Sequence, residues 1–139
     1  MRSYLVVANE TLLDDALLEA VRAKKAAGPS RFHLLVPAKH PKGQWSEGSI
    51  RAPAEERLQE GMRHFQNNDI EVTGEVGDSN PVHAVGDVII REPFDEVIIS
   101  TLAPGPSHWL RQDAPARIRR VLELPVTHVS RVRTAALSH

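Results

Sequence analysis

Among the residues that could take part in chemistry, the histidines are spread along the whole sequence. There are seven, at positions 33, 40, 64, 83, 108, 128 and 139. No two show the i, i+4 spacing that places two metal ligands on one helix face. Cysteine is absent, which excludes disulfides, thiolate zinc sites and cysteine nucleophiles. We therefore interpret the histidines as structural or solvent-exposed residues, and we predict neither a metal site nor a catalytic residue.

His108 requires a separate interpretation because it stands beside Trp109 in the loop that follows a predicted central strand. It could move a proton or contact a ligand there. The favoured alternative is that Trp109 and Leu110 bury their side chains under the loop while His108 stays in water. A second long connection, 38–50, contains Trp45, which could close over a ligand but is better interpreted as pinning the loop to the surface.

The common nucleotide and hydrolase motifs are absent. Ala-Asn-Glu-Thr (8–11) stands after the first predicted strand, where a dinucleotide-binding domain has Gly-x-Gly-x-x-Gly. There is no Gly-Lys-Ser/Thr, His-x-Gly-His, Ser-Gly-Gly-x-Asp-Ser or Gly-x-Ser-x-Gly sequence. P-loop, adenylate-transfer and serine-hydrolase chemistry of the usual kinds is therefore not indicated.

The elements that must position these residues alternate regularly. Short apolar runs predict five strands, at Tyr4–Ala8, Phe32–Pro37, Ile70–Val76, Glu96–Ser100 and Val126–Val132. Four helical stretches separate them, at Thr11–Ala27, Ala52–Asn67, Pro81–Arg91 and a segment after Asp113. This alternation predicts an α/β fold, a doubly wound parallel sheet with helices on both faces. Ligands bind such sheets at the carboxyl ends of the strands.

The helix predictions rest on apolar stripes and on end signals. The first stripe is Leu13, Leu17, Ala20 and Val21, flanked by Leu12 and Leu18, and Gly28-Pro29 ends that helix. Asn80 caps the third helix and Pro81 occupies its first position. In the fourth helix, Ile118, Val121 and Leu122 are predicted to face inward.

The length of the chain and its distribution of charge further restrict the class of protein. The 139 residues, 1–139, form one domain, and no apolar run approaches the roughly 20 residues of a membrane span, so we expect a cytoplasmic protein. Residues 1–100 carry 11 Lys and Arg against 16 Asp and Glu, whereas residues 101–139 carry six Arg against Asp113 and Glu123. The favoured interpretation of Arg117, Arg119 and Arg120 is a solvated helix face. Nucleic-acid binding is not indicated, because aromatic residues are scarce.

The sequence resembles the universal stress protein family over nearly its whole length. The segment Val76-Gly-Asp-Ser-Asn-Pro-Val82 is similar to the family's turn before the third helix, and Pro125-Val126 is similar to the start of its last strand. Asn9 and Thr11 fall where the family often has Asp and Ser. The resemblance implies a strand order of 3-2-1-4-5 and a homodimer, which we expect to form through the last strand, Val126–Val132.

The nucleotide site departs from the family pattern. ATP-binding members resemble Gly-x2-Gly-x9-Gly-Ser/Thr, and the matching positions here fall near Ser100, Ala103, Gln112 and Asp113, without a glycine. Gly105 lies between two prolines, which supply no N–H group. Asp113 would cap the following helix and repel phosphate. Any residual ligand site should therefore comprise Ala8, Asn9, Thr11, Ser100, Thr101, Ala103, Gly105, Arg111, Gln112 and Asp113.

Three hypotheses follow. The first is a non-catalytic regulatory or stress-response module, homodimeric, with weak or no ATP binding and no required cofactor. The second is a true ATP or adenine-nucleotide binder, with ATP hydrolysis at most weak, that uses a variant loop. The third is a sensor of another small anion held by Arg111 and Arg117.

Overall fold

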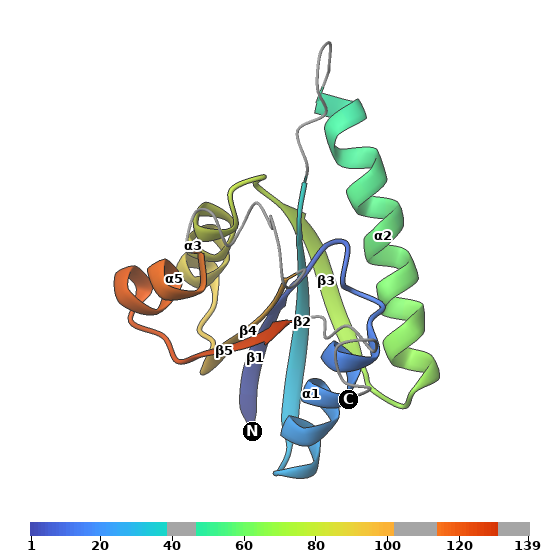
Figure 1. The fold of residues 1–139 in the computed structure, drawn as a ribbon, viewed down its shortest axis with the longest axis vertical. Helices are drawn as coiled ribbons and strands as arrows, with labels where there is room; N and C mark the ends of the chain where they lie inside the picture. Colours follow the sequence, from blue (N-terminus) through green and yellow to red (C-terminus); the bar gives the residue numbers. More distant parts are fainter. Residues whose placement is uncertain (39–46, 102–113, 131–139) are drawn as a thin grey trace, which may run out of the picture.

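The computed structural model describes residues 1–38, 47–101 and 114–130, with the side chains of 47–51 excluded. Its described part contains one five-stranded, all-parallel sheet of order β3-β2-β1-β4-β5 (Figure 1). The strands are β1 (Arg2–Val7), β2 (Ser30–Pro37), β3 (Val72–Gly77), β4 (Glu96–Thr101) and β5 (Val126–Ser130). The helices are α1 (Asp15–Ala26), α2 (Glu47–Asn67), α3 (Pro81–Arg91) and α5 (Ala114–Leu122). The predicted α/β fold, five strands and strand order are confirmed.

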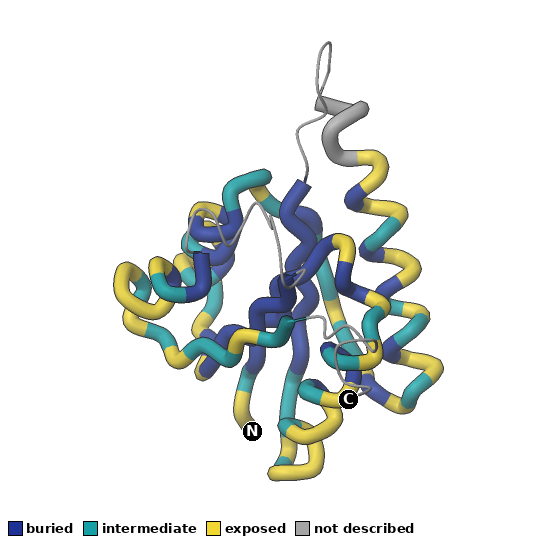
Figure 2. The backbone as a smooth tube through the Cα atoms, in the orientation of Figure 1, coloured by how far each residue is buried: buried dark blue, intermediate teal, exposed yellow. Residues whose placement is uncertain are grey.

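Helices cover both faces of the sheet, as predicted. Alternate side chains of β1 separate the core into two layers, because successive strand residues point to opposite faces. Tyr4 and Val6 pack with α1 and α2, whereas Leu5 and Val7 pack with α3 and α5. The tube coloured by burial shows the central strands almost entirely buried (Figure 2). In β4, Val97, Ile98 and Ile99 have no exposed surface, which confirms the predicted strand buried on both faces.

Helix α3 follows the sequence prediction at both ends. The Asn80 side chain accepts hydrogen bonds from the backbone N–H groups of Val82 (2.9 Å) and His83 (3.3 Å). Pro81 is the first helical residue, where its missing N–H leaves no partner unsatisfied. Because cap and proline act locally, these boundaries could be read from the sequence.

The predicted start of α1 at Thr11 is wrong, because the helix begins at Asp15. Residues 9–14 form turns instead, in which the Leu12 N–H binds the Asn9 carbonyl and the Asp14 N–H binds the Thr11 carbonyl. This places Leu12 in the core and leaves Leu13 at 40% exposure, so Leu13 does not belong to the apolar stripe. Leu17, Leu18 and Val21 are buried, and Ala20 is half-buried.

Helix α2 begins at Glu47, five residues before the predicted Ala52, and it contains Pro53. The prediction placed Pro53 in the first turn, where proline is common. The last part of the 38–50 connection is thus helical, while Trp45 lies outside the described residues. In α5 the predicted orientation is right for two of three residues: Ile118 is buried and Leu122 is partly buried, but Val121 is 60% exposed.

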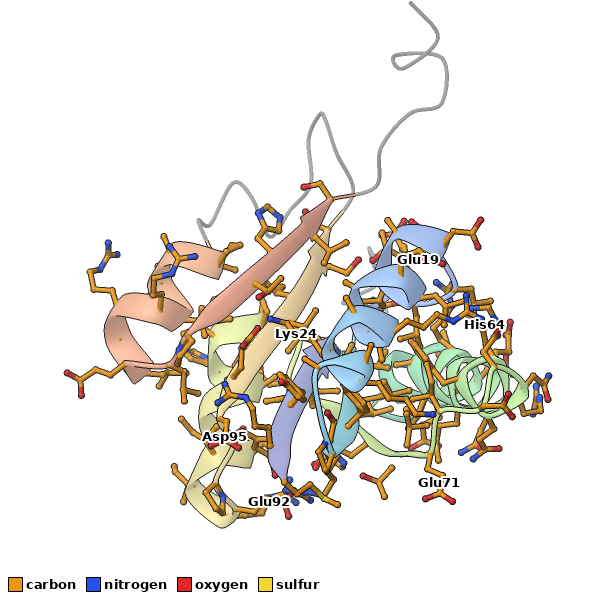
Figure 3. All side chains as sticks on the ribbon, turned by 90° about the horizontal axis from the view of Figure 1, so that it is seen from below. Glu19, Lys24, His64, Glu71, Glu92 and Asp95 are labelled. Atoms are coloured by element: carbon orange, nitrogen blue, oxygen red, sulfur yellow. The ribbon has the colours of Figure 1, made fainter. Side chains whose placement is uncertain are left out.

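A buried carboxylate, that of Glu96, lies at the amino ends of β4 and β5 and binds residues of α1 and β5. Glu96, only 7% exposed, lies 2.9 Å from the ammonium group of Lys24 and accepts a 2.5 Å hydrogen bond from the Thr127 hydroxyl. Figure 3 looks onto this end of the molecule, with Lys24 reaching over the sheet from α1. A buried charge is tolerated when it is paired and hydrogen-bonded, as Glu96 is. The described residues contain no helix that is both long and apolar enough to cross a membrane.

Candidate functional site

The candidate site lies where the strand order reverses, at the carboxyl ends of β1 and β4. The chain leaves β1 toward β2 on one side, while β4 pairs with β1 on the other, and Val7 stands opposite Ile99. The residues that follow Val7 and Ile99 are therefore neighbours, although they are about ninety positions apart in the chain. This crevice is where open α/β sheets bind their ligands.

A direct hydrogen bond joins the two sides of this crevice. The hydroxyl oxygens of Thr11 and Ser100 are 2.6 Å apart, and each residue is only 2% exposed. Ser100 lies on the α1 side of the sheet, as do Val6 and Ala8 of the neighbouring segment. Each buried hydroxyl therefore has a partner, which buried polar groups require.

Asn9 and Arg57 shape the adjoining β1–α1 turn. The Asn9 side-chain amide donates a 2.6 Å hydrogen bond to the Pro37 carbonyl, and the Ala8 N–H binds the Leu35 carbonyl at 3.2 Å. Arg57, from α2, donates a 3.0 Å hydrogen bond to the Asn9 carbonyl. The turn is thus tied to the carboxyl end of β2 and to the middle of α2, and it has a half-buried arginine beside it.

Thr101 extends the site toward β5. Its hydroxyl lies 2.7 Å from Nε2 of His128, and the Ser130 hydroxyl lies 3.4 Å from the same nitrogen. Burial, followed by the charge of Arg119, lowers the pKa of His128 below its ordinary 6.5. The neutral form of the imidazole is therefore favoured at pH 7, and its Nε2 can accept a hydrogen bond from the Thr101 hydroxyl. This pair lies on the α3 and α5 side of the sheet, opposite the Thr11–Ser100 pair.

Half of the predicted site residues are placed together by the structure: Ala8, Asn9, Thr11, Ser100 and Thr101. The other half lies outside the described residues: Ala103, Gly105, Arg111, Gln112 and Asp113. The sequence analysis missed Arg57, Ser130 and the role of His128. His128 stands opposite Ile99 in the middle of β5, the strand beside β4, and its place in a predicted strand was the available sequence signal. Arg57 had no such signal, since helix α2 is brought to the turn only by packing.

The chemistry of the described site residues is that of neutral hydrogen-bonding groups: hydroxyls, an amide and a neutral imidazole, with Arg57 at the margin. Within the described ranges, no group of three or more His, Cys, Asp or Glu residues is arranged to hold a metal ion. The fold and this site define a doubly wound α/β domain with a polar crevice at its switch point.

Comparison with known proteins identifies the fold. No family model matches the sequence, and no curated protein matches it. A universal stress protein solved in complex with cAMP superposes with a TM-score of 0.63 and 16% identity, covering 96% of this chain and 97% of that one.

Two further solved structures have the same fold. A universal stress protein family member from Arabidopsis thaliana with AMP bound gives a TM-score of 0.60 at 12% identity, over 99% of this chain and 97% of that one. The Archaeoglobus fulgidus universal stress protein in complex with dAMP gives 0.56 at 15% identity, over 93% and 98%. The chain therefore has the fold of the universal stress protein family.

Proposed function

We propose that this protein is a non-catalytic regulatory module of the universal stress protein type, with an altered nucleotide site that binds ATP weakly. The observation that carries the proposal is the buried Thr11–Ser100 hydrogen bond across the switch point, 2.6 Å long. In this bond, the two hydroxyls that face each other in the crevice are hydrogen-bonded to each other. The described residues there offer hydrogen bonds but no carboxylate–nucleophile pair that would perform hydrolysis.

The sequence after β4 supports weak rather than tight phosphate binding. A phosphate cradle needs free backbone N–H groups and close approach of the backbone, which glycine permits. Pro104 and Pro106 supply no N–H group, and no glycine stands at the matching positions. Asp113 adds a carboxylate, and two like charges about 4 Å apart repel by about 1 kcal/mol in water and about 4 kcal/mol near a protein surface.

Calorimetric titration with MgATP tests this proposal. We expect a dissociation constant weaker than about 100 μM; a value in the low micromolar range, about −8 kcal/mol, would contradict it. The double variant Asp113→Ser with Gln112→Gly should bind MgATP more tightly, because it removes the carboxylate and adds a glycine. If the affinity does not change, the prolines rather than the carboxylate are the obstacle.

The second candidate is a true adenine-nucleotide binder. Two observations favour it: AMP, cAMP and dAMP are bound in structures with this fold, and Arg57 lies beside the β1–α1 turn as a cation. Mass spectrometry of ligand released from freshly purified protein distinguishes the two candidates. Adenine nucleotide in near-stoichiometric amount would favour the second, and MgATP titration would then give tight binding after the nucleotide is removed.

The proposal includes assembly as a homodimer through β5. This strand pairs with β4 alone among the described strands, and residues Val126–Ser130 carry no charged side chain. Val126 and Val129 are only half-buried within one copy. An uncharged strand edge with open backbone groups is a surface that another strand can cover, and a two-fold pairing of the same strand would cover both.

A further inference from the structure

A second constellation of reactive groups lies on β2 and β3, away from the switch point. His33 joins a hydroxyl to a carboxylate: its Nδ1 is 2.6 Å from the Thr73 hydroxyl, and its Nε2 is 2.8 Å from Oε2 of Glu75. The His33 side chain is 11% exposed, and its ring stacks on Phe94 with ring centroids 6.0 Å apart. Thr73, by contrast, is exposed.

The hydrogen-bond partners of His33 determine the tautomer of its ring. Glu75 also accepts a hydrogen bond from Arg91. Desolvation, the largest single effect, raises the pKa of Glu75, but the hydrogen bonds from His33 and Arg91 together outweigh it and lower that pKa. An ionised carboxylate only accepts, so it faces an N–H at Nε2 of His33, and in that tautomer Nδ1 is an acceptor. The Thr73 hydroxyl therefore donates to Nδ1.

This order of groups is the hydroxyl–imidazole–carboxylate arrangement that activates an oxygen nucleophile, recognised by geometry and role rather than by sequence position. The carboxylate holds the imidazole in one tautomer, and the imidazole takes the hydroxyl proton. At the Thr101–His128 pair no carboxylate contact is found among the described residues, and the charge that acts on His128 is that of Arg119. The Thr73 cluster is thus the more complete of the two.

A groove of about 800 Å³ adjoins Thr73 at the amino ends of β2 and β3. Thr73 itself lines it, together with the polar or charged residues Ser30, Arg31, Gln66, Asp69 and Glu71. Glu71, labelled in Figure 3, lies at the outer margin of the same end of the sheet. The apolar lining residues are Met1, Phe32, Ile70 and Val72, of which Phe32 and Ile70 are each only 2% exposed. The groove therefore offers room, but little apolar surface, beside the exposed hydroxyl.

We propose that Thr73 is a self-acylation site that accepts an acyl group from an activated ester that enters this groove. The Thr73 oxygen attacks the ester carbonyl carbon while its proton passes to Nδ1 of His33. The bond between the carbonyl carbon and the leaving alcohol's oxygen then breaks, and that oxygen takes the proton from His33. The products are O-acyl-Thr73 and a free alcohol, so the step is a stoichiometric modification of a regulatory module.

The test uses the purified full chain with p-nitrophenyl octanoate as the acyl donor. Intact mass spectrometry counts the acyl groups, and tryptic mapping places them. The tryptic peptide His64–Arg91 contains no lysine or tyrosine, and its hydroxyl side chains are those of Thr73 and Ser79. An octanoyl group on Thr73 within that peptide, formed with release of p-nitrophenol, is the expected result.

Three variants separate activation from accidental acylation. Thr73→Ser should keep the reaction, because it keeps the hydroxyl. His33→Gln should slow it at least tenfold. Thr127→Val, which removes a strand hydroxyl bound to a carboxylate without an imidazole, should leave the rate unchanged. Acylation confined to lysines or the amino terminus, or an equal rate in folded Thr73→Ser and His33→Gln proteins, would overturn the proposal.

Discussion

The two edges of the sheet are built differently. The β3 edge carries Thr73 and Glu75, and Glu75 holds both His33 and Arg91. The β5 edge, Val126–Ser130, has no charged residue. Charged side chains discourage pairing between strand edges, whereas an uncharged edge permits it. The contrast favours β5 over β3 as the edge of the proposed dimer.

Each edge region also has a strand histidine bonded to a threonine hydroxyl on the neighbouring strand, and the surroundings of the two rings differ. His33 is nearly buried and lies between a hydroxyl and a carboxylate. His128 is exposed and lies near the cation Arg119. The histidine–threonine pair therefore lies beside a carboxylate at one edge and beside a guanidinium at the other. We expect the stability contributed by the two edges to change in separate pH ranges.

The largest expected effect concerns assembly. Val129 and Val72 are half-buried edge valines that pack against the same core layer, so lysine at either position can keep its aliphatic stem in place. Val129→Lys should weaken the dimer at least about 100-fold, about 2.7 kcal/mol, because it puts charge into the β5 pairing. Val72→Lys should change the dissociation constant less than about twofold. Sedimentation equilibrium measures the dissociation constants of both variants. A wild-type protein that is monomeric at tens of micromolar would contradict the proposed dimer.

The next effect tests the carboxylate at the β3 edge. Glu75→Gln should lower the free energy of unfolding by about 1.5 kcal/mol at pH 7, because it loses charge-assisted hydrogen bonds to His33 and Arg91. The pKa of Glu75 is lowered from 4.5 in the folded protein. Its stabilisation is therefore present above pH 4.5 and is lost as the pH falls through the lowered pKa.

Urea unfolding from pH 7 to pH 3 checks this prediction. The difference between wild type and Glu75→Gln should shrink below pH 4.5. Glu71→Gln, an exposed carboxylate just before the same strand, is the control and should change stability by less than about 0.5 kcal/mol. A difference independent of pH would show that the side chain's packing, rather than its charge, matters.

A smaller effect is expected at the turn that leads into β3. Asp69 adopts a left-handed backbone conformation, with φ of 62°. The turn closes α2 through a 2.9 Å bond from the Ile70 N–H to the Phe65 carbonyl. Asp69→Gly should raise stability by about 0.5–1 kcal/mol, because glycine adopts this conformation without strain. Thermal unfolding measures the change, and a lower Tm would mean that the Asp69 side chain stabilises the turn.

The smallest effect concerns His128. Its pKa is lowered below 6.5 in the folded protein, so the unfolded chain binds the proton more readily, and stability falls as the pH drops below 6.5 toward the lowered pKa. The loss should be about 0.3 kcal/mol, since water screens an exposed ring. His128→Asn should abolish this part of the pH dependence between pH 7 and pH 5.5 and leave the Glu75 range unchanged. A loss confined to below pH 4.5 would contradict the separation of the two edges.

The sequence by itself determined the features that depend on neighbouring residues. The buried run Val97–Ile99 predicted a central strand because such a run is apolar on both faces. Asn80 and Pro81 predicted the start of α3 because cap and proline act within one turn. The strand order was implied by resemblance to a family, and the structure confirmed it.

Only the tertiary structure decided the rest. Thr11 belongs to a turn, not to α1, and its hydroxyl bonds Ser100, 89 positions away. His33 obtains its carboxylate from a strand 42 positions away, and the exposure of Leu13 and Val121 follows from which helix faces meet the sheet. Local propensities differ by less than about 1 kcal/mol per residue, so a buried hydrogen bond or core contact of similar size overrides them. Such contacts exist only once the sheet has assembled.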